Sequence, residues 1–138
     1  MLTAVAAGEL GALVVGGVDL RDLADPAAAR AALDAVGLLV SLEVRSSEDT
    51  ARADVVLPVC LTEERAGTFW NLEGRERPFG VVIGVGTSGG VAKTTAMSDL
   101  RVLSALAEAL GRPLGVRTPE QARAEVRELG SWDGERRS

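Results

Sequence analysis

Short apolar runs alternate with polar segments through the first half of the chain. Each run has the length and the aliphatic composition of a buried strand, and the runs span residues 12–18, 38–44 and 54–59. Between the first two, Asp25 is suited to cap a helix, Pro26 to take its first position, and Gly37 to end it in the left-handed conformation. Continuous apolar strands separated by helices predict an α/β fold, a parallel sheet with helices on both faces.

The loops that follow these strands are the expected place for a binding site. In doubly wound sheets, ligands lie beyond the carboxyl ends of the parallel strands. These loops carry charged side chains at Asp19, Glu43, Arg45, Glu48 and Glu63. The simpler alternative is that all five are ordinary solvated loop residues. Between the second and third strands, Ser46 or Ser47 is expected to cap a short helix.

The second half of the chain has a different pattern. Aromatic and charged residues gather in residues 63–79, which read EERAGTFWNLEGRERPF. Gly67 and Gly74 permit turns there, so we expect either an irregular hairpin or a strap laid over the sheet. Residues 80–97 are rich in glycine and are expected to form a flexible loop, with a short strand at 81–85.

Two helices are expected after this loop. Ser98 and Thr118 are suited to cap them, and Gly111 and Gly130 to end them. The first has an apolar stripe that we expect to face the core. The stripe consists of Leu100, Leu103, Leu106, Ala107 and Leu110.

These elements predict one domain over residues 1–130, followed by a polar tail over residues 131–138. Trp132 of the tail is expected to pack back on the domain.

Composition narrows the functions that this chain can carry. Its net charge of −5 argues against nucleic-acid binding, which needs a basic face. With no histidine and one cysteine, Cys60, it lacks histidine-based proton transfer and the usual ligands of an iron–sulfur cluster. We expect no catalytic residue and no metal site. No apolar run approaches the roughly 20 residues that span a bilayer, and no signal peptide is evident. We therefore expect a cytoplasmic location without direct membrane insertion.

One glycine-rich segment suggests a different function. Residues 88–95, SGGVAKTT, resemble the variant phosphate-binding loop of certain ATPases. In that interpretation Lys93 would hold the terminal phosphates and Thr94 a magnesium ion. However, Ala92 replaces the glycine beside the lysine, and the next helix is predicted to begin only after Ser98. We therefore expect a linker loop here and keep ATP binding as a distant alternative.

Three ordered motifs give the chain a broader resemblance. They are Gly16, Gly17 and Asp19 after the first strand, Thr50, Ala51 and residues 53–58 around the third, and Glu64, Gly67, Thr68, Asn71, Glu73 and Arg75 beyond it. In order and spacing these motifs resemble the molybdopterin oxidoreductase superfamily, although the Thr-Ala segment is one residue shorter here. The resemblance covers about residues 7–111 and implies the Rossmann-like domain of that superfamily.

Within the superfamily, the chain is most similar to the large iron–sulfur subunits of respiratory complex I (NADH-quinone oxidoreductase) of the actinobacterial type. Gly74 carries part of this resemblance, because cofactor-binding relatives tend to have arginine there. The resemblance implies a portion of a larger subunit that carries iron–sulfur clusters and relays electrons from NADH to quinone. Other complex I subunits would be its partners, and the complex would hold it at the inner face of the plasma membrane. In this branch we expect a non-catalytic scaffold that binds no cofactor itself.

The resemblance leaves a second function open, that of a pterin-cofactor-binding portion of a molybdopterin oxidoreductase. The cofactor would then lie near Gly16, Gly17, Asp19, Thr50 and Asp54, residues that are vestigial in the scaffold interpretation.

Residues 63–79 have two matching interpretations. As a structural strap, they would be anchored by their three aromatic residues and fixed by charge-assisted bonds of Glu73, Arg75 and Arg77. In the alternative, the arginines grip the phosphates of a pterin cofactor.

Overall fold

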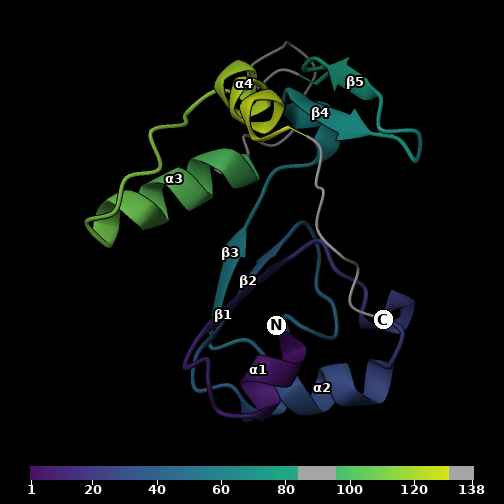
Figure 1. Cartoon of the computed structure of the whole chain (residues 1–138), viewed down its shortest axis with the longest axis vertical. Helices are drawn as coiled ribbons and strands as arrows, with labels where there is room; N and C mark the ends of the chain where they lie inside the picture. The colour runs from purple at the N-terminus through teal and green to yellow at the C-terminus, as the bar shows by residue number, and fades with distance from the viewer. Residues whose placement is uncertain (84–95, 131–138) are drawn as a thin grey trace. The chain divides into compact units, whose positions relative to one another are not determined.

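The structure is a computed structural model that describes residues 1–83 and 96–130. The chain forms two compact units, Met1–Cys60 and Leu61–Ser138 (Figure 1). The boundary follows directly after the third predicted strand. A single domain over residues 1–130 stays a prediction.

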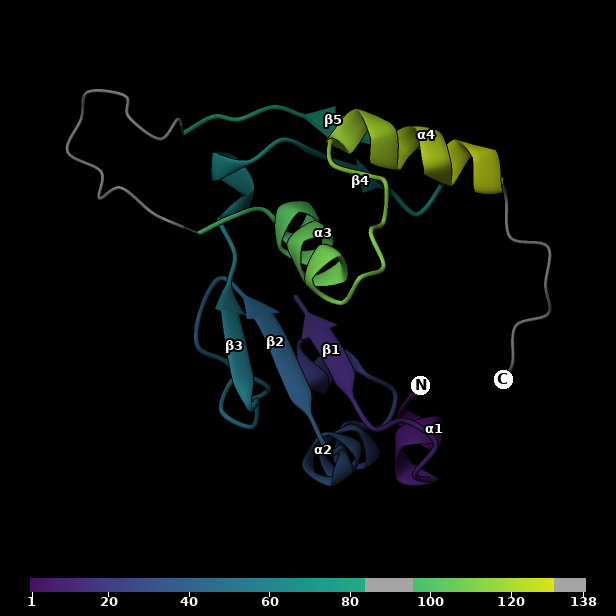
Figure 2. The same ribbon diagram turned by 90° about the vertical axis from the view of Figure 1, so that its left-hand side faces the viewer.

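The first unit contains a three-stranded sheet whose strands all run in the same direction. Its elements are α1 (Leu2–Ala6), β1 (Leu13–Gly16), η1 (Leu20–Asp22), α2 (Pro26–Ala35), β2 (Leu39–Glu43) and β3 (Val55–Pro58). The strand order is β1-β2-β3, and both pairs are parallel, as the three arrows in Figure 2 show. The predicted α/β fold with a parallel sheet is therefore confirmed.

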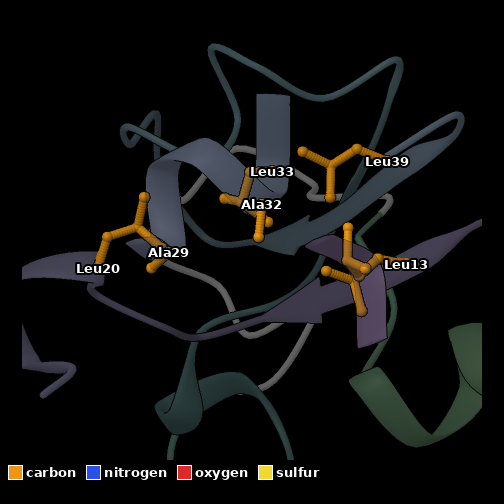
Figure 3. Packing of buried hydrophobic residues seen from close by; sticks show 7 residues of the cluster. Leu13, Leu20, Ala29, Ala32, Leu33 and Leu39 are labelled. Carbon is orange, nitrogen blue, oxygen red and sulfur yellow. The ribbon is translucent and has the colours of Figure 1, made fainter. Parts of the chain in front are cut away.

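Helix α2 covers one face of this sheet and builds the core of the unit. The register pairs Leu13 with Leu39, so both side chains point to the same face, toward α2 (Figure 3). The buried cluster consists of Val5, Leu13, Leu20, Ala29, Ala32, Leu33 and Leu39. Removal of these apolar side chains from water is the main stabilising contribution in this unit.

The opposite face of the sheet carries half-exposed valines. Val14 pairs with Val40, and Val40 with Val55, so these three share the face that α2 does not cover. Val14 and Val55 are 45% and 42% exposed, whereas Leu42 on the same face is buried. The described helices of the first unit therefore cover one face of the sheet, and they supply no layer on the other.

Helix α2 begins as predicted but ends differently. The Asp25 carboxylate accepts a hydrogen bond of 2.9 Å from the backbone N–H three residues on, and Pro26 takes the first helical position. The prediction that Gly37 ends the helix in the left-handed conformation is wrong, because Val36 caps it in an extended conformation and Gly37 has no positive φ. Gly37 has another role, since a Cβ there would lie 3.1 Å from the Gly11 carbonyl oxygen.

The segment between β2 and β3 forms turns, so the short helix predicted after Ser46 or Ser47 is wrong. The Asp49 side chain points inward and is 1% exposed. It accepts hydrogen bonds from Ser41 Oγ at 2.8 Å and from Ser47 Oγ at 2.6 Å. The bond from Ser41 ties the segment to the middle of β2. Hydrogen bonds between the Thr50 side chain and the Ser47 backbone compete with the backbone bonds that a helix would need.

The second unit consists of a β-hairpin and two longer helices. Its elements are η2 (Thr62–Glu64), β4 (Gly67–Trp70), β5 (Glu76–Phe79), α3 (Asp99–Ala109) and α4 (Pro119–Leu129). Strands β4 and β5 pair antiparallel, so residues 63–79 contain a hairpin, one of the two expected forms. Residues 81–83 are not in a strand, contrary to the prediction for 81–85.

Two glycines make the hairpin possible. Gly74 has a φ of +73°, in the left-handed region that side chains disfavour, and its N–H donates to the Asn71 carbonyl at 2.9 Å. A Cβ at Gly67 would lie 2.6 Å from Phe79 Cζ. The space left by Gly67 is filled by the Phe79 ring, which stacks on Phe69 with ring centroids 4.7 Å apart.

Both long helices of the second unit begin where predicted. Ser98 is the N-cap of α3, and Thr118 is the N-cap of α4. Thr118 and Gln121 form a capping box, in which Thr118 Oγ1 accepts from Gln121 N at 3.3 Å and Gln121 Oε1 accepts from Thr118 N at 3.1 Å. Gly111 and Gly130 follow the two helices with φ of +69° and +72°.

The predicted apolar stripe is not the buried face of α3. Leu103 and Leu110 are exposed by 38% and 70%, whereas Val102 and Ser104 are buried. Ser104 Oγ donates a hydrogen bond of 2.8 Å to the Val116 carbonyl. This bond offsets the cost of burying the hydroxyl group. The apolar pattern did not predict it, because a serine outside the apolar stripe is expected to face water.

Several predictions lie outside the described residues. They concern most of the glycine-rich loop, including Lys93, and the tail over residues 131–138 with Trp132. Among the helices in residues 1–83 and 96–130, none combines the length and apolar character that crossing a membrane requires.

Candidate functional site

A cleft opens where β1 and β2 end. It has a volume of about 760 Å³ and is lined by residues 17–22 and 43–49, the loops that follow these two strands. Because the strands are parallel, their carboxyl ends meet at this edge of the sheet. The cleft therefore lies where the sequence predicts a binding site, and it contains the predicted residues Gly17 and Asp19.

The Glu43 side chain joins the two loops of the cleft. Glu43 is the last residue of β2, and its Oε1 accepts a hydrogen bond of 2.8 Å from Gly17 N. Gly17 follows β1 with a φ of +62°. The backbone N–H at the start of this loop is thus bonded to an anion from the chain itself.

Asp19 is paired with the arginine two residues later. Its Oδ1 accepts from the backbone N and from Nε of Arg21, each at 3.0 Å, and its Oδ2 accepts from Arg21 Nη2 at 2.6 Å. The hydrogen bonds from Arg21, with a smaller contribution from the charge of Arg45, hold the pKa of Asp19 well below its usual 3.8. Asp19 is therefore ionised, and its oxygens are engaged within the loop.

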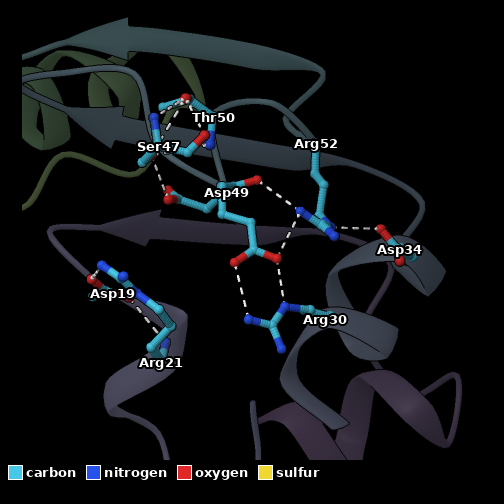
Figure 4. A network of polar contacts seen from close by, with 9 residues as sticks. Asp19, Arg21, Arg30, Asp34, Ser47, Asp49, Thr50 and Arg52 are labelled. Carbon is cyan, nitrogen blue, oxygen red and sulfur yellow. Dashed lines mark hydrogen bonds and ion pairs between the residues drawn. The ribbon is translucent and has the colours of Figure 1, made fainter. Parts of the chain in front are cut away.

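Thr50 is engaged in a turn with Ser47 (Figure 4). Its Oγ1 accepts from Ser47 N at 2.8 Å and donates to the Ser47 carbonyl at 2.9 Å, while Ser47 Oγ accepts from Thr50 N at 3.3 Å. Thr50 lines a neighbouring hollow of about 520 Å³ rather than the main cleft. The hollow shares residues 43–47 with the cleft, so Thr50 lies beside the candidate site.

Glu48 ties the cleft to helix α2. Its carboxylate accepts hydrogen bonds from Arg30 Nε and Nη2, the second at 3.1 Å. Arg52 Nη1 lies 3.3 Å from the same carboxylate, and Arg52 Nε donates to Asp34 at 2.9 Å (Figure 4). The hydrogen bond from Arg30 is the main cause that lowers the pKa of Glu48. This loop is therefore held to the helix by charge-assisted bonds.

Besides Thr50, two other predicted residues, Gly16 and Asp54, do not line the cleft. Gly16 is the last residue of β1, where a Cβ would come within 3.4 Å of Leu42 Cβ. Asp54 lies at the other edge of the sheet, where its Oδ2 accepts from Leu39 N at 2.8 Å and its N donates to the Leu39 carbonyl at 2.9 Å. Leu39 begins β2, so Asp54 sits at the amino ends of the strands, away from Gly17 and Asp19.

Three residues that shape this region were not singled out from the sequence. Arg30 follows the fully buried Ala29 in α2, and its place at the rim of an apolar helix face was a usable signal. Ser41 and Asp49 gave no signal, because a serine in an apolar strand and an acid in a polar loop are both common.

The cleft is acidic, and its residues suit a phosphate-containing cofactor poorly. It is lined by Asp19, Asp22, Glu43, Glu48 and Asp49, against Arg21 and Arg45. Phosphate groups would meet this excess of negative charge, and the Gly17 amide already has a partner. One buried cysteine, Cys60, cannot supply the ligands of an iron–sulfur cluster. Within residues 1–83 and 96–130, no group of three or more histidine, cysteine, aspartate or glutamate residues could hold a metal ion.

The second unit has a smaller, mainly apolar hollow of about 380 Å³ between the hairpin and both long helices. Arg65 in its wall forms an ion pair with Asp99 at the start of α3. Arg65 Nε and Thr68 Oγ1 are buried side-chain atoms without a partner in the described part of the chain. The acid among its lining residues, Asp99, is paired with Arg65, and the hollow is less polar than the cleft.

Comparisons with known proteins identify a family to which the chain is similar and several proteins that resemble it along nearly its whole length. The family model described as molybdopterin oxidoreductase matches residues 1–112. The chain is 48% identical, over 136 residues, to the G subunit of NADH-quinone oxidoreductase from Streptomyces coelicolor, an alignment that covers 99% of this chain and 16% of that protein. It is 50% identical over 134 residues to the proteins of the same name from Mycobacterium bovis and Mycobacterium tuberculosis, with 97% of this chain and 16% of each relative covered.

The chain thus spans 16% of the length of these curated relatives. The family match includes the whole first unit, with its cleft, and extends through the hairpin and α3. The resemblance seen in the motifs is therefore confirmed. The chain belongs to the molybdopterin oxidoreductase family, and the proteins to which it is similar over almost its whole length are G subunits of NADH-quinone oxidoreductase.

Proposed function

We propose that this chain is a non-catalytic scaffold portion of the complex I subunit that relays electrons from NADH to quinone. The name of its relatives, the G subunit of NADH-quinone oxidoreductase, supports this assignment over 97–99% of the chain. Its partners are other complex I subunits, and through them it lies at the inner face of the plasma membrane. The iron–sulfur clusters of such a subunit are held outside this chain, which has one cysteine.

One observation carries the scaffold assignment. Apart from Gly16, every residue predicted to face a cofactor has a polar group that is already bonded within the chain. Gly17 bonds to Glu43, Asp19 to Arg21, Thr50 to Ser47, and Asp54 to Leu39. A working cofactor site instead directs free donors and acceptors at its ligand. Gly16, Gly17, Asp19, Thr50 and Asp54 are therefore a vestige of a cofactor site, with a structural role.

Membership of the complex is tested by purification. An affinity tag is placed on the complete subunit that contains this chain, and the bound proteins are eluted under mild conditions. NADH:quinone reductase activity is expected to elute with the tagged subunit in a constant ratio. Elution of the subunit without that activity contradicts the assignment.

The absence of a pterin cofactor is tested on the same purified assembly. Molybdenum is measured by elemental analysis, and released pterin by its fluorescence. Both are expected to be far below the amount of the subunit. Stoichiometric molybdenum and pterin would support the alternative, in which this chain is the cofactor-binding portion of a molybdopterin oxidoreductase.

The distant alternative of ATP binding depends on residues 88–95, which lie outside the described residues. Titration of the chain with ATP tests it directly. We expect no saturable binding. Micromolar binding that the substitution Lys93→Ala abolishes would instead support an ATP-binding domain.

A further inference from the structure

The contact between Glu43 and Gly17 occupies a position where sheets of this kind offer a site for anions. In parallel α/β sheets, the glycine-containing turn after the first strand presents backbone N–H groups beyond the carboxyl end of the strand, and these bind phosphate. Gly17 has that place here, directly after β1 and with a φ of +62°. Its N–H donates at 2.8 Å to Glu43 Oε1.

We propose that Glu43 fills, with its own carboxylate, a latent phosphate-binding site and thereby closes the cleft to phosphate groups. The inference deepens the proposed scaffold function, on which it depends, by naming the residue that keeps the vestigial site empty of ligand. A carboxylate and a phosphate oxygen are both acceptors for the one Gly17 N–H, so they exclude each other.

Removal of the Glu43 charge makes the surroundings of Gly17 less unfavourable for an anion, with Asp22 and Asp49 still in the lining of the cleft. The carboxylates of Asp19 and Glu48 are each bonded to an arginine, Arg21 and Arg30 respectively. Arg45 lines the cleft, and in the described part of the chain it makes no hydrogen bond or ion pair. Without the Glu43 carboxylate, the cleft would therefore present a free backbone N–H, with the Arg45 guanidinium also in its lining.

Glu43 also acts through its charge, not only by occupying the N–H. A phosphate at this position would lie a few Å from the carboxylate in a partly solvated cleft. At that distance, repulsion between like charges changes an affinity by about tenfold or more. The two effects can be separated by substitution. Glu43→Gln removes the charge and keeps an acceptor oxygen, whereas Glu43→Ala removes both the charge and the acceptor.

The test compares pyrophosphate binding by the whole 138-residue chain with binding by Glu43→Ala and Glu43→Gln, using calorimetry at low ionic strength. We expect at least about tenfold tighter binding for Glu43→Ala than for the unmodified chain, and a smaller gain for Glu43→Gln. Addition of pyrophosphate to Glu43→Ala is expected to shift the Gly17 amide resonance. Circular dichroism establishes that the variants are folded, and Glu43→Gln keeps the bridging acceptor if Glu43→Ala is not stable.

Asp22→Asn is the matched control. Asp22 lines the same cleft and loses the same charge in this variant, yet its carboxylate makes no hydrogen bond in the described structure. We expect at most a small gain in pyrophosphate affinity. An equal gain in Asp22→Asn and the Glu43 variants would overturn the proposal, since general charge would then explain it.

The remaining outcomes separate the two proposals. If neither the unmodified chain nor a folded Glu43 variant binds pyrophosphate, the latent site is refuted and the scaffold function stands. If the unmodified chain binds it tightly, Glu43 does not close the cleft and the latent-site proposal is refuted, while the scaffold function is decided separately by the purification and by the molybdenum and pterin measurements.

Discussion

The two units of the chain bury their side chains to different extents. In the first unit, apolar residues from α1, β1, η1, α2 and β2 form one buried cluster. In the second unit, Val102 and Ser104 are the only buried residues among those described, and several large apolar side chains are exposed. They include Phe69, Trp70, Leu72, Leu110 and Leu129.

The difference follows from how each unit is connected. Parallel strands need a crossover connection, and α2 is the crossover between β1 and β2. Packing of α2 on these strands buries apolar side chains that are far apart in sequence. A two-stranded hairpin is marginal by itself in water. The second unit therefore depends more on individual contacts, which are helix caps, the stacked rings of Phe69 and Phe79, and surface ion pairs between its elements. We expect core substitutions to act mainly in the first unit and backbone or capping substitutions mainly in the second.

The largest effect is expected from Leu39→Ala in β2. Leu39 is 1% exposed and lies in the buried cluster, so its truncation leaves a cavity that costs about 2–5 kcal/mol of unfolding free energy. Urea unfolding followed by circular dichroism measures the loss. Leu72→Ala in the second unit is the control, since Leu72 is fully exposed and its replacement should cost less than about 0.5 kcal/mol. Similar losses for both variants would contradict the contrast between the units.

The next effect is expected in the hairpin. Gly74→Val places a β-branched residue at a φ of +73°, which should destabilise the hairpin by about 1–3 kcal/mol through backbone strain. Thermal unfolding followed by tryptophan fluorescence reports it, because Trp70 lies in β4. Gly80→Val is the matched control, for Gly80 has no positive φ and a Cβ there meets no atom within 4 Å. An unchanged melting curve for Gly74→Val would show that the turn does not need glycine.

A smaller effect is expected from helix capping. Thr118→Ala removes one half of the capping box of α4 and should cost about 1 kcal/mol. Hydrogen exchange of the Gln121 amide measures it locally, since that N–H loses its partner. Ser98→Ala is the comparison, because the Ser98 side chain makes no capping bond to α3. Equal acceleration of exchange at the starts of both helices would mean that the capping bond of Thr118 contributes nothing.

Local patterns in the sequence predicted the elements better than their packing. The apolar runs located β1, β2 and β3 within one or two residues, and the caps at Asp25 and Thr118 were correct. The short helix α1 was not predicted. The prediction of the buried face of α3 was wrong, because the burial of Ser104 depends on its hydrogen bond to the carbonyl of Val116, twelve residues away.

The candidate site shows the same limit. Gly17 and Asp19 were correctly placed at the carboxyl end of β1, since a glycine-containing loop after an apolar strand is a local signal. Thr50 and Asp54 are close in sequence, yet Thr50 lies near the carboxyl ends of the strands and Asp54 at their amino ends. The parallel pairing of β3 with β2 determines at which end of the strands Thr50 and Asp54 lie.

The smallest changes in stability are expected from breaking one exposed ion pair in each unit. Arg127 of α4 donates two hydrogen bonds to Glu76 of β5, and these are the main cause that lowers the pKa of Glu76 from its usual 4.5. A carboxylate with a lowered pKa in the folded state stabilises the fold above its usual pKa, and this contribution disappears as the pH falls through the lowered value. Arg127→Gln should therefore reduce stability at neutral pH and match the unmodified chain in strong acid.

Arg30→Gln in the first unit should follow the same pH dependence with a smaller amplitude. Arg30 is the main cause that lowers the pKa of Glu48, but Arg52 remains 3.3 Å from that carboxylate when Arg30 is removed. Glu76 has no second arginine bonded to it in the described part of the chain. Urea midpoints between neutral pH and strong acid, at low and high salt, measure both differences. Both should shrink with salt, as expected for exposed pairs, and a larger change for Arg30→Gln would show that Arg52 does not substitute for Arg30.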